Sequence, residues 1–155
     1  MVNIITGEIN SGKTSRLVKL YGEINRGDGF FCRKNYIANH YTGQMIVRLT
    51  TGESTCFSFK QDFIPPGWDE VYTFDDYSFS RAGILFAQKV AMEIVQRNIQ
   101  PVFIDEIGPL ELMESGFHEI LEQFLYLETN LYLVIRASCL LEVINKYHIA
   151  AFQIV

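Results

Sequence analysis

Gly7, Gly12, Lys13 and Thr14 have the spacing G-x-x-x-x-G-K-T, which is typical of loops that bind phosphate. Glycines let backbone N–H groups approach an anion that a Cβ would keep away. The lysine brings a full positive charge to the β- and γ-phosphates, and the threonine hydroxyl is a ligand for Mg²⁺. The flanking strand and helix patterns favour this interpretation over a glycine-bearing turn without chemistry. The predicted phosphate-binding residues are Gly7, Glu8, Ile9, Asn10, Ser11, Gly12, Lys13, Thr14 and Ser15.

Two adjacent acids, Asp105 and Glu106, end an apolar run and would supply the other half of this chemistry. A nucleoside triphosphate needs Mg²⁺, and Mg²⁺ needs a carboxylate in addition to phosphate oxygens. We therefore expect Asp105 to bind the metal and Glu106 to act as the general base for water. Neighbours on a strand point to opposite faces, so both acids reach one site only where the strand ends. The alternative is a pair of solvated acids.

Three basic residues are candidates for contact with the phosphates. Arg136 follows the apolar run NLYLVI and should emerge at the same sheet edge as Asp105, where it could sense the γ-phosphate. A surface arginine at a strand end is the alternative. Arg33 and Lys34 either reach the nucleotide from a β-rich segment or lie on a solvated loop. The predicted catalytic residues are Lys13, Glu106 and Arg136, and the predicted metal ligands are Thr14 and Asp105.

The elements that must position these residues follow from the hydrophobic pattern. Apolar runs predict strands at residues 2–6, 71–74, 102–106, 130–135 and 150–155. Apolar stripes at helical spacing predict helices at residues 15–24, 78–98, 117–125 and 138–147. Alternation on both sides of Thr51-Gly52 predicts a β-hairpin within residues 43–59.

Strands that alternate with helices predict an α/β fold, with a mostly parallel sheet covered by helices on both faces. The antiparallel β-hairpin is an insertion early in this pattern. A chain of 155 residues is expected to form one domain. We expect that domain to span residues 1–155, with a β-rich insertion at residues 28–75.

Composition narrows the classes of partner and the cellular location. The net charge of −5 argues against a nucleic-acid partner, whose phosphates favour a basic surface. No apolar run approaches the roughly 18 residues that span a bilayer, and the N-terminus lacks the pattern of a signal peptide. The three cysteines are widely spaced, which is typical of free thiols in a reducing compartment. The expected location is cytoplasmic.

The segments TGEINSGKT, GDGFFCRK, LTTGE and especially VFIDEIGPLEL resemble the THEP1-like nucleoside-triphosphatase family, in order along most of the chain. The resemblance implies a three-layer, RecA-like P-loop NTPase that hydrolyses ATP or GTP with Mg²⁺ and a loose base preference. It assigns the phosphate loop, Asp105 as the Mg²⁺ residue and Glu106 as the base. Glu111 matches a second acid of the signature, and Pro109 stands where the family commonly has lysine.

Two other functions remain open at this stage. A P-loop kinase for a nucleoside or another small molecule would use the same donor site and add an acceptor site. A nucleotide-dependent switch or adaptor would bind a protein partner through the Phe- and Tyr-rich insertion, with little turnover. The sequence does not distinguish a protein partner from homo-oligomerisation, and no residue is visibly dedicated to reading a base.

Overall fold

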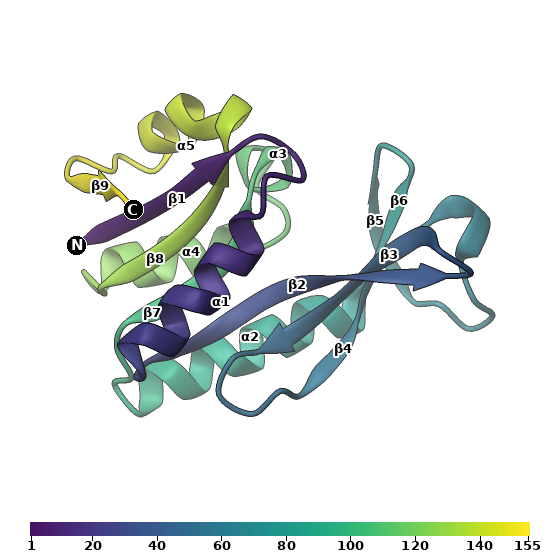
Figure 1. Cartoon of the computed structure of the whole chain (residues 1–155), viewed down its shortest axis with the longest axis horizontal. Helices are drawn as coiled ribbons and strands as arrows, with labels where there is room; N and C mark the ends of the chain where they lie inside the picture. Colours follow the sequence, from purple (N-terminus) through teal and green to yellow (C-terminus); the bar gives the residue numbers. More distant parts are fainter.

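A computed structural model describes residues 1–155 as a nine-stranded sheet with helices on both faces (Figure 1). None of these helices combines the length and hydropathy needed to cross a bilayer. In chain order, the strands and helices are β1 (Val2–Gly7), α1 (Lys13–Ile24), β2 (Asp28–Ile37), β3 (His40–Arg48), β4 (Ser54–Lys60), a 3₁₀ turn (Gln61–Phe63), β5 (Glu70–Phe74), β6 (Tyr77–Ser80), α2 (Arg81–Gln96), β7 (Val102–Ile107), α3 (Pro109–Leu112), α4 (His118–Tyr126), β8 (Leu131–Arg136), a 3₁₀ turn (Ala137–Cys139), α5 (Leu140–Lys146) and β9 (Phe152–Ile154).

Five strands form a parallel half of the sheet, in the order β2-β7-β8-β1-β9. Their apolar residues alternate between the two faces. On one face, Ile5 and Val134 pack with Leu17 of α1. On the other face, a core cluster joins these strands to α2, α4 and α5. The predicted α/β fold with helices on both faces is confirmed, and it brings the carboxyl ends of β1, β7 and β8 to one edge.

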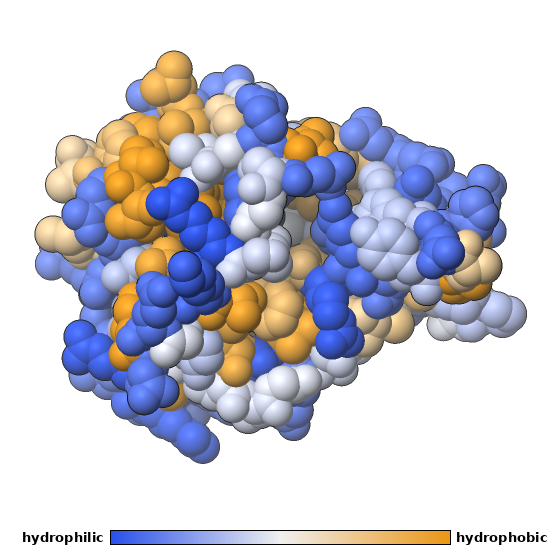
Figure 2. Space-filling view, in the orientation of Figure 1, coloured by the Kyte–Doolittle hydropathy of each residue, from blue (hydrophilic) through white to orange (hydrophobic).

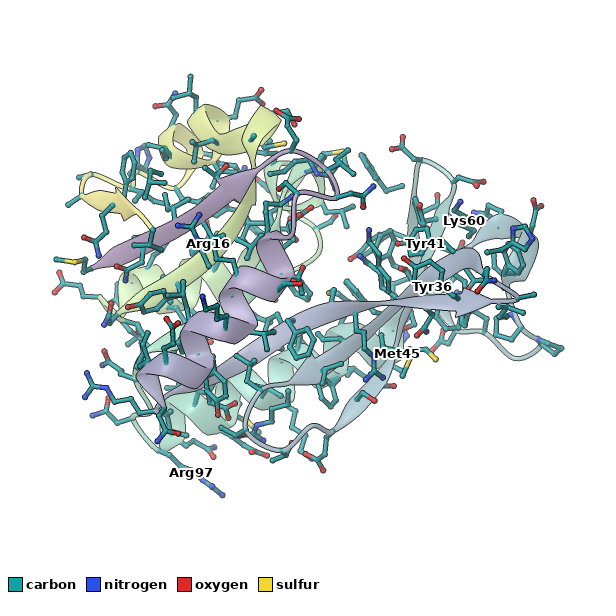
Figure 3. The ribbon with its side chains drawn as sticks, viewed as in Figure 1. Arg16, Tyr36, Tyr41, Met45, Lys60 and Arg97 are labelled. Atoms are coloured by element: carbon teal, nitrogen blue, oxygen red, sulfur yellow. The ribbon has the colours of Figure 1, made fainter.

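The antiparallel half of the sheet continues from β2 in the order β3-β4-β6-β5. β3 and β4 pair antiparallel from Gly43 opposite Phe59 to Val47 opposite Ser54. Figure 1 places these strands to the right of the parallel half, and Figure 3 shows Tyr41 and Lys60 on them, beside Tyr36 of β2. The surface is hollowed between the two halves (Figure 2).

β2 joins the halves because it pairs with β7 in parallel and with β3 antiparallel. A buried charge network supports this junction. Both oxygens of Asp28 are used: Oδ2 accepts hydrogen bonds from Arg48, and Oδ1 accepts them from the backbone of Gly29 and Thr50. Arg48 also pairs with Glu93 of α2 at 2.5 Å. The network therefore ties β2 and β3 to the helix behind them.

One helix was predicted with the wrong start, and one strand was not predicted. The helix predicted at residues 78–98 begins only at Arg81, because the Ser80 hydroxyl accepts a hydrogen bond from Gly83 N and caps it. Ser78 and Phe79 instead pair with β4 and β5. The sequence reading also missed β2, whose ten residues lack an alternating pattern and are held by pairing on both sides.

Candidate functional site

The loop between β1 and α1 has the conformation that its glycines permit. Gly12 caps α1 with φ of 85°, a left-handed value that favours glycine. A Cβ at Gly7 would lie 2.5 Å from Ser11 Oγ, so glycine allows the loop to turn tightly there. The loop thus ends at a helix N-terminus, which favours anions.

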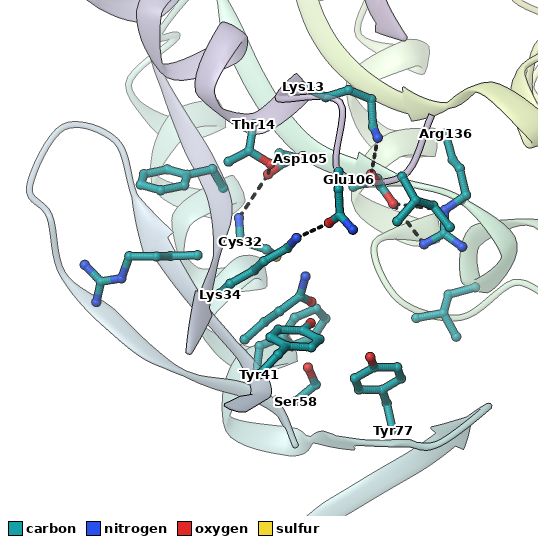
Figure 4. Close-up of a pocket in the computed structure, with 18 of the residues that line it drawn as sticks. Lys13, Thr14, Cys32, Lys34, Tyr41, Ser58, Tyr77, Asp105, Glu106 and Arg136 are labelled. Carbon is teal, nitrogen blue, oxygen red and sulfur yellow. Dashed lines mark hydrogen bonds and ion pairs between the residues drawn. The ribbon is translucent and has the colours of Figure 1, made fainter. Parts of the chain in front are cut away.

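Lys13 extends from the start of α1 back across this loop. Its Nζ donates a 2.8 Å hydrogen bond to the Glu8 carbonyl oxygen and lies 3.5 Å from Glu106 Oε2. The side chain is only 7% exposed. The lysine therefore lies between the phosphate loop and the acidic end of β7 (Figure 4).

Asp105 is buried at the end of β7, directly beside the loop. Its Oδ2 accepts hydrogen bonds from Thr14 Oγ1 at 2.8 Å and from Cys32 N at 3.2 Å. Its Oδ1 is buried without a partner. Burial raises the pKa of Asp105 to about 7, although the Thr14 and Cys32 hydrogen bonds act in the opposite direction. An unpaired buried carboxylate oxygen of this kind is suited to a cation.

Glu106 faces the same cavity as Asp105, although both lie within β7. The register between β7 and β8 shifts between Ile104 and Ile107, and such irregularities redirect side chains. The expectation that both acids need the strand to have ended was therefore wrong. Glu106 Oε1 accepts hydrogen bonds from Arg136 Nη2 at 3.0 Å and Nε at 3.2 Å.

The three basic candidates, Arg33, Lys34 and Arg136, all line the cavity. Arg136 ends β8 at the same edge as Asp105, as expected, and pairs with Glu106. Arg33 and Lys34 belong to β2. Lys34 donates a hydrogen bond to the Asn10 side chain and so links β2 to the phosphate loop.

The sequence did not predict that Glu111 is buried. Its carboxylate is 2% exposed and accepts hydrogen bonds from Gly108 N at 2.8 Å and Phe117 N at 2.9 Å. A Cβ at Gly116 would lie 2.2 Å from Glu111 Oε1, so glycine is required there. Burial raises the pKa of Glu111 to about 7. Through these two hydrogen bonds Glu111 holds together the ends of the segment from Gly108 to Phe117, and Pro109 of this segment lines the cavity.

One cavity of about 1280 Å³ is lined by the loop residues from Ile9 to Ser15 together with Asp105, Glu106, Glu111 and Arg136. Gly7 and Glu8 of the predicted phosphate loop do not line it. It extends from the phosphate loop to tyrosines of the antiparallel half. Those tyrosines are a further part of the lining that the sequence did not indicate, because nothing in their spacing distinguishes them from core residues. No group of three or more His, Cys, Asp or Glu side chains that could hold a metal ion is present.

Of the three cysteines, Cys32 lines the cavity, and its backbone N–H contacts Asp105. All three cysteines are free, as expected. Burial, followed by the nearby carboxylates, raises the pKa of Cys32 well above its usual range, so its thiol stays protonated. The His118 side chain is 13% exposed, and its Nδ1 lies 2.8 Å from the Tyr147 hydroxyl.

Comparisons with known proteins agree with this architecture. Residues 3–154 match the family described as NTPase. The structure of THEP1 from the hyperthermophile Aquifex aeolicus has a TM-score of 0.75 and 22% identity, covering 100% of this chain and 88% of that chain. The solution structure of a human cancer-related nucleoside triphosphatase has a TM-score of 0.66 and 21% identity, covering 99% of this chain and 86% of that chain. At these identities the two structures establish the fold, which is that of P-loop NTPases.

No curated protein sequence matches the chain. The family match extends over nearly its full length, from β1 through β9, and includes the phosphate loop and both acids of β7. The chain therefore belongs to the NTPase family.

Proposed function

We propose that this protein is a Mg²⁺-dependent nucleoside triphosphatase that cleaves the γ-phosphate of ATP or GTP with a loose base preference. The observation that best supports this is the 2.8 Å hydrogen bond between Thr14 and Asp105, which joins the phosphate loop to the acidic end of β7. Lys13 and Glu106 lie beside that contact, 3.5 Å apart. Membership of the NTPase family supports the same reaction class.

The residues present fit Mg²⁺. Asp105 Oδ1 is a buried oxygen without a partner, and the Thr14 hydroxyl lies next to the same carboxylate. Mg²⁺ is commonly held by one or two carboxylates together with substrate phosphates, so a larger cluster of acids is not needed. In this proposal Thr14 and Asp105 hold the metal. When bound, it would neutralise charge on the phosphate oxygens.

The phosphate loop and Lys13 bind the triphosphate. Backbone N–H groups between Gly7 and Ser15 contact phosphate oxygens, and the N-terminus of α1 favours their negative charge. Lys13 exchanges its present partners, the Glu8 carbonyl and Glu106, for the β- and γ-phosphates. Because the ammonium is only 7% exposed, water screens this interaction weakly.

Glu106 acts as the general base. Its carboxylate is held by Arg136 and remains 29% exposed, so a water molecule can reach it. The water oxygen bonds to the γ-phosphorus as the bond from that phosphorus to the β–γ bridging oxygen breaks. The proton of the water passes to Glu106, and the products are a nucleoside diphosphate and inorganic phosphate.

Arg136 stabilises the charge that develops on the γ-phosphate. It lies at the end of β8 with its guanidinium 3.0 Å from Glu106 Oε1, so one group contacts the base and the reacting phosphate together. Charge stabilisation from an arginine supplied by the same chain is established in phosphoryl transfer. The pair also fixes the direction of the Glu106 carboxylate.

The nucleoside leaves the loop on the side of Ser15, where Val18 and Lys19 line the cavity. An aliphatic side chain and a flexible lysine offer contact to any base without a fixed pattern of donors and acceptors. This supports a loose base preference. We further propose that residues 1–155 act as one domain with a β-rich insertion, and that the free thiols reflect a cytoplasmic location.

Phosphate release from ATP, GTP, CTP and UTP, with Mg²⁺ or with EDTA, tests the proposal. Release should require Mg²⁺ and proceed with all four substrates. Glu106→Gln should retain nucleotide binding and lose about a hundredfold or more in turnover. Glu128→Gln, an exposed acid outside the cavity, is the matched control. Normal turnover by Glu106→Gln would remove Glu106 as the base.

A further inference from the structure

The end of the cavity farthest from the phosphate loop has a lining that hydrolysis does not use. We call it the tyrosine end and define it by Tyr36, Tyr41, Gln44, Ser58 and Tyr77, which belong to strands of the antiparallel half and its junction. Figure 4 shows Tyr41, Ser58 and Tyr77 across an open space from Lys13, Glu106 and Arg136. Polar and aromatic groups thus face the reacting end of the bound triphosphate.

The cavity is larger than one substrate requires. Its volume of about 1280 Å³ exceeds the roughly 300–1,000 Å³ usual for a small-molecule site. The triphosphate occupies the end formed by the loop and α1. The tyrosine end therefore has room for a second small molecule.

Ser58 provides an independent indication of a ligand. The residue is 1% exposed, and its Oγ is buried without a hydrogen-bond partner although it lines the cavity. Leaving a buried hydroxyl without a hydrogen bond is unfavourable, so such groups usually have a partner. A polar group of a bound molecule would supply that partner.

The remaining groups indicate what kind of molecule fits. The rings of Tyr36 and Tyr41 lie 5.9 Å apart, and those of Tyr41 and Tyr77 lie 6.1 Å apart. They form an aromatic wall suited to a flat ring. Lys34 and Lys60 lie over the Tyr41 ring, at 5.7 Å and 5.3 Å from its centroid, and add positive charge.

Hydrogen-bonding capacity at this end matches a sugar. Gln44 offers an amide, Ser58 a hydroxyl and the tyrosines phenol groups, all on the cavity wall. Burial raises the pKa of Tyr41, so its phenol keeps its proton at neutral pH and remains a donor. A flat ring joined to a hydroxylated sugar, with or without a phosphate, combines these requirements.

We propose that the tyrosine end is an acceptor site for a nucleoside or a nucleoside monophosphate, to which the γ-phosphoryl group is transferred. The proposal rests on the proposed function, because the same bound triphosphate is the donor. The aromatic wall takes the base, and the sugar or its phosphate points towards Glu106. The same geometry would also lead to hydrolysis of the triphosphate when no acceptor is bound.

The transfer step balances without any other reactant. An acceptor oxygen bonds to the γ-phosphorus as the bond to the β–γ bridging oxygen breaks, and that electron pair leaves with the nucleoside diphosphate. Where the acceptor oxygen is a hydroxyl, its proton passes to Glu106. Where it is an ionised phosphate oxygen, no proton moves.

The experiment uses the full chain, Mg²⁺ and ATP or GTP labelled at the γ-phosphate. Adenosine, guanosine, cytidine and uridine are offered in separate reactions, and their 5′-monophosphates in a second set. Label recovered in an acceptor supports the proposal, and the two sets distinguish nucleosides from nucleotides. Labelled phosphate released without any acceptor measures hydrolysis in parallel.

Ser58→Ala and Tyr77→Phe test whether the acceptor occupies the tyrosine end. Each should lower the ratio of transfer to hydrolysis by at least about threefold, the scale of one lost hydrogen bond. A misfolded variant would lose both activities together and leave the ratio unchanged. Ser54→Ala, an exposed serine at the start of β4, is the matched control.

Each outcome decides between the two proposals. Hydrolysis without label in any of the eight compounds overturns the acceptor site and leaves the hydrolase standing. If both variants hydrolyse the triphosphate at the parent rate and the ratio of transfer to hydrolysis is also unchanged, the location of the acceptor site is overturned. If the protein shows no hydrolysis and no transfer, the proposed function itself is overturned.

Discussion

The Thr14 hydroxyl donates a 2.8 Å hydrogen bond to Asp105 Oδ2 across 91 positions of sequence. Thr14 lies in the first turn of α1, and Asp105 lies in β7. One contact therefore joins the two segments that carry the phosphate-binding and acidic residues. The other oxygen of Asp105 remains buried and unpaired.

Asp105→Asn should abolish Mg²⁺-dependent turnover. Asparagine keeps an oxygen that can accept from the Thr14 hydroxyl, so the local fold is retained while the charge that attracts the metal is lost. We expect phosphate release to fall about a hundredfold or more, the scale of losing one main electrostatic group. A Mg²⁺ titration of phosphate release measures this. Asp76→Asn, on an exposed turn, should behave like the parent protein.

Arg136→Ala should lower turnover more than it weakens nucleotide binding. The guanidinium contacts Glu106 at 3.0 Å, so its removal frees the base and withdraws charge from the γ-phosphate. A fall in kcat of about a hundredfold or more is expected for an arginine in this role. Arg97→Ala is the control, because Arg97 is exposed, does not line the cavity and lies far from Tyr36 and Tyr41 in Figure 3. A change in KM alone would contradict the assignment.

Arg48→Met should strongly destabilise the protein without changing any residue of the proposed nucleotide site. It removes the partner of Asp28, which is 0% exposed, and leaves that carboxylate charged and buried. Breaking a buried pair in this way costs about 3–5 kcal/mol. Urea unfolding measures the loss. Lys19→Met, which removes the exposed pair with Glu23 on α1, should change the free energy of unfolding by less than about 1 kcal/mol.

The free energy of unfolding should decrease as the pH rises from about 5 to 8. Burial raises the pKa of Asp105 and of Glu111 to about 7, from ordinary values of 3.8 and 4.5. Between those values the folded protein holds protons that the unfolded chain has released, so raising the pH favours unfolding. The stabilisation is complete below about pH 4 and is lost as the pH passes 7.

Glu111→Gln isolates one part of this dependence. The variant should be less stable at every pH, because an amide nitrogen cannot accept a hydrogen bond from both Gly108 N and Phe117 N. Its stability should also vary less with pH than that of the parent, since one of the two shifted carboxyl groups is gone. Urea unfolding at pH 5, 6, 7 and 8 gives both slopes. Equal slopes would contradict the raised pKa of Glu111.

Apart from β2, the parallel half of the fold could be predicted because its strands are apolar and its helices have clear apolar stripes. The same pattern placed Lys13, Asp105 and Arg136 at one edge, since parallel strands end together. β2 could not be predicted. Its residues Arg33–Ile37 carry no alternation, and pairing with β3 holds them in the sheet.

Within the site, the positions of side chains that depend on tertiary packing could not be predicted from the sequence. Both acids of β7 face the cavity because of a register shift relative to β8, which no local pattern reveals. Glu111 is buried to bind two backbone N–H groups of its own segment. Ser58 and Tyr77 reach the cavity only because the antiparallel strands extend the sheet past the parallel half.

A crystal structure of the protein with Mg²⁺ and a non-hydrolysable analogue of ATP or GTP tests the central claim most directly. The account predicts Mg²⁺ about 2.1 Å from Thr14 Oγ1 and beside Asp105, with the γ-phosphate between Lys13 and Glu106. An analogue whose phosphates lie outside the loop, or a metal held away from Asp105, would contradict it.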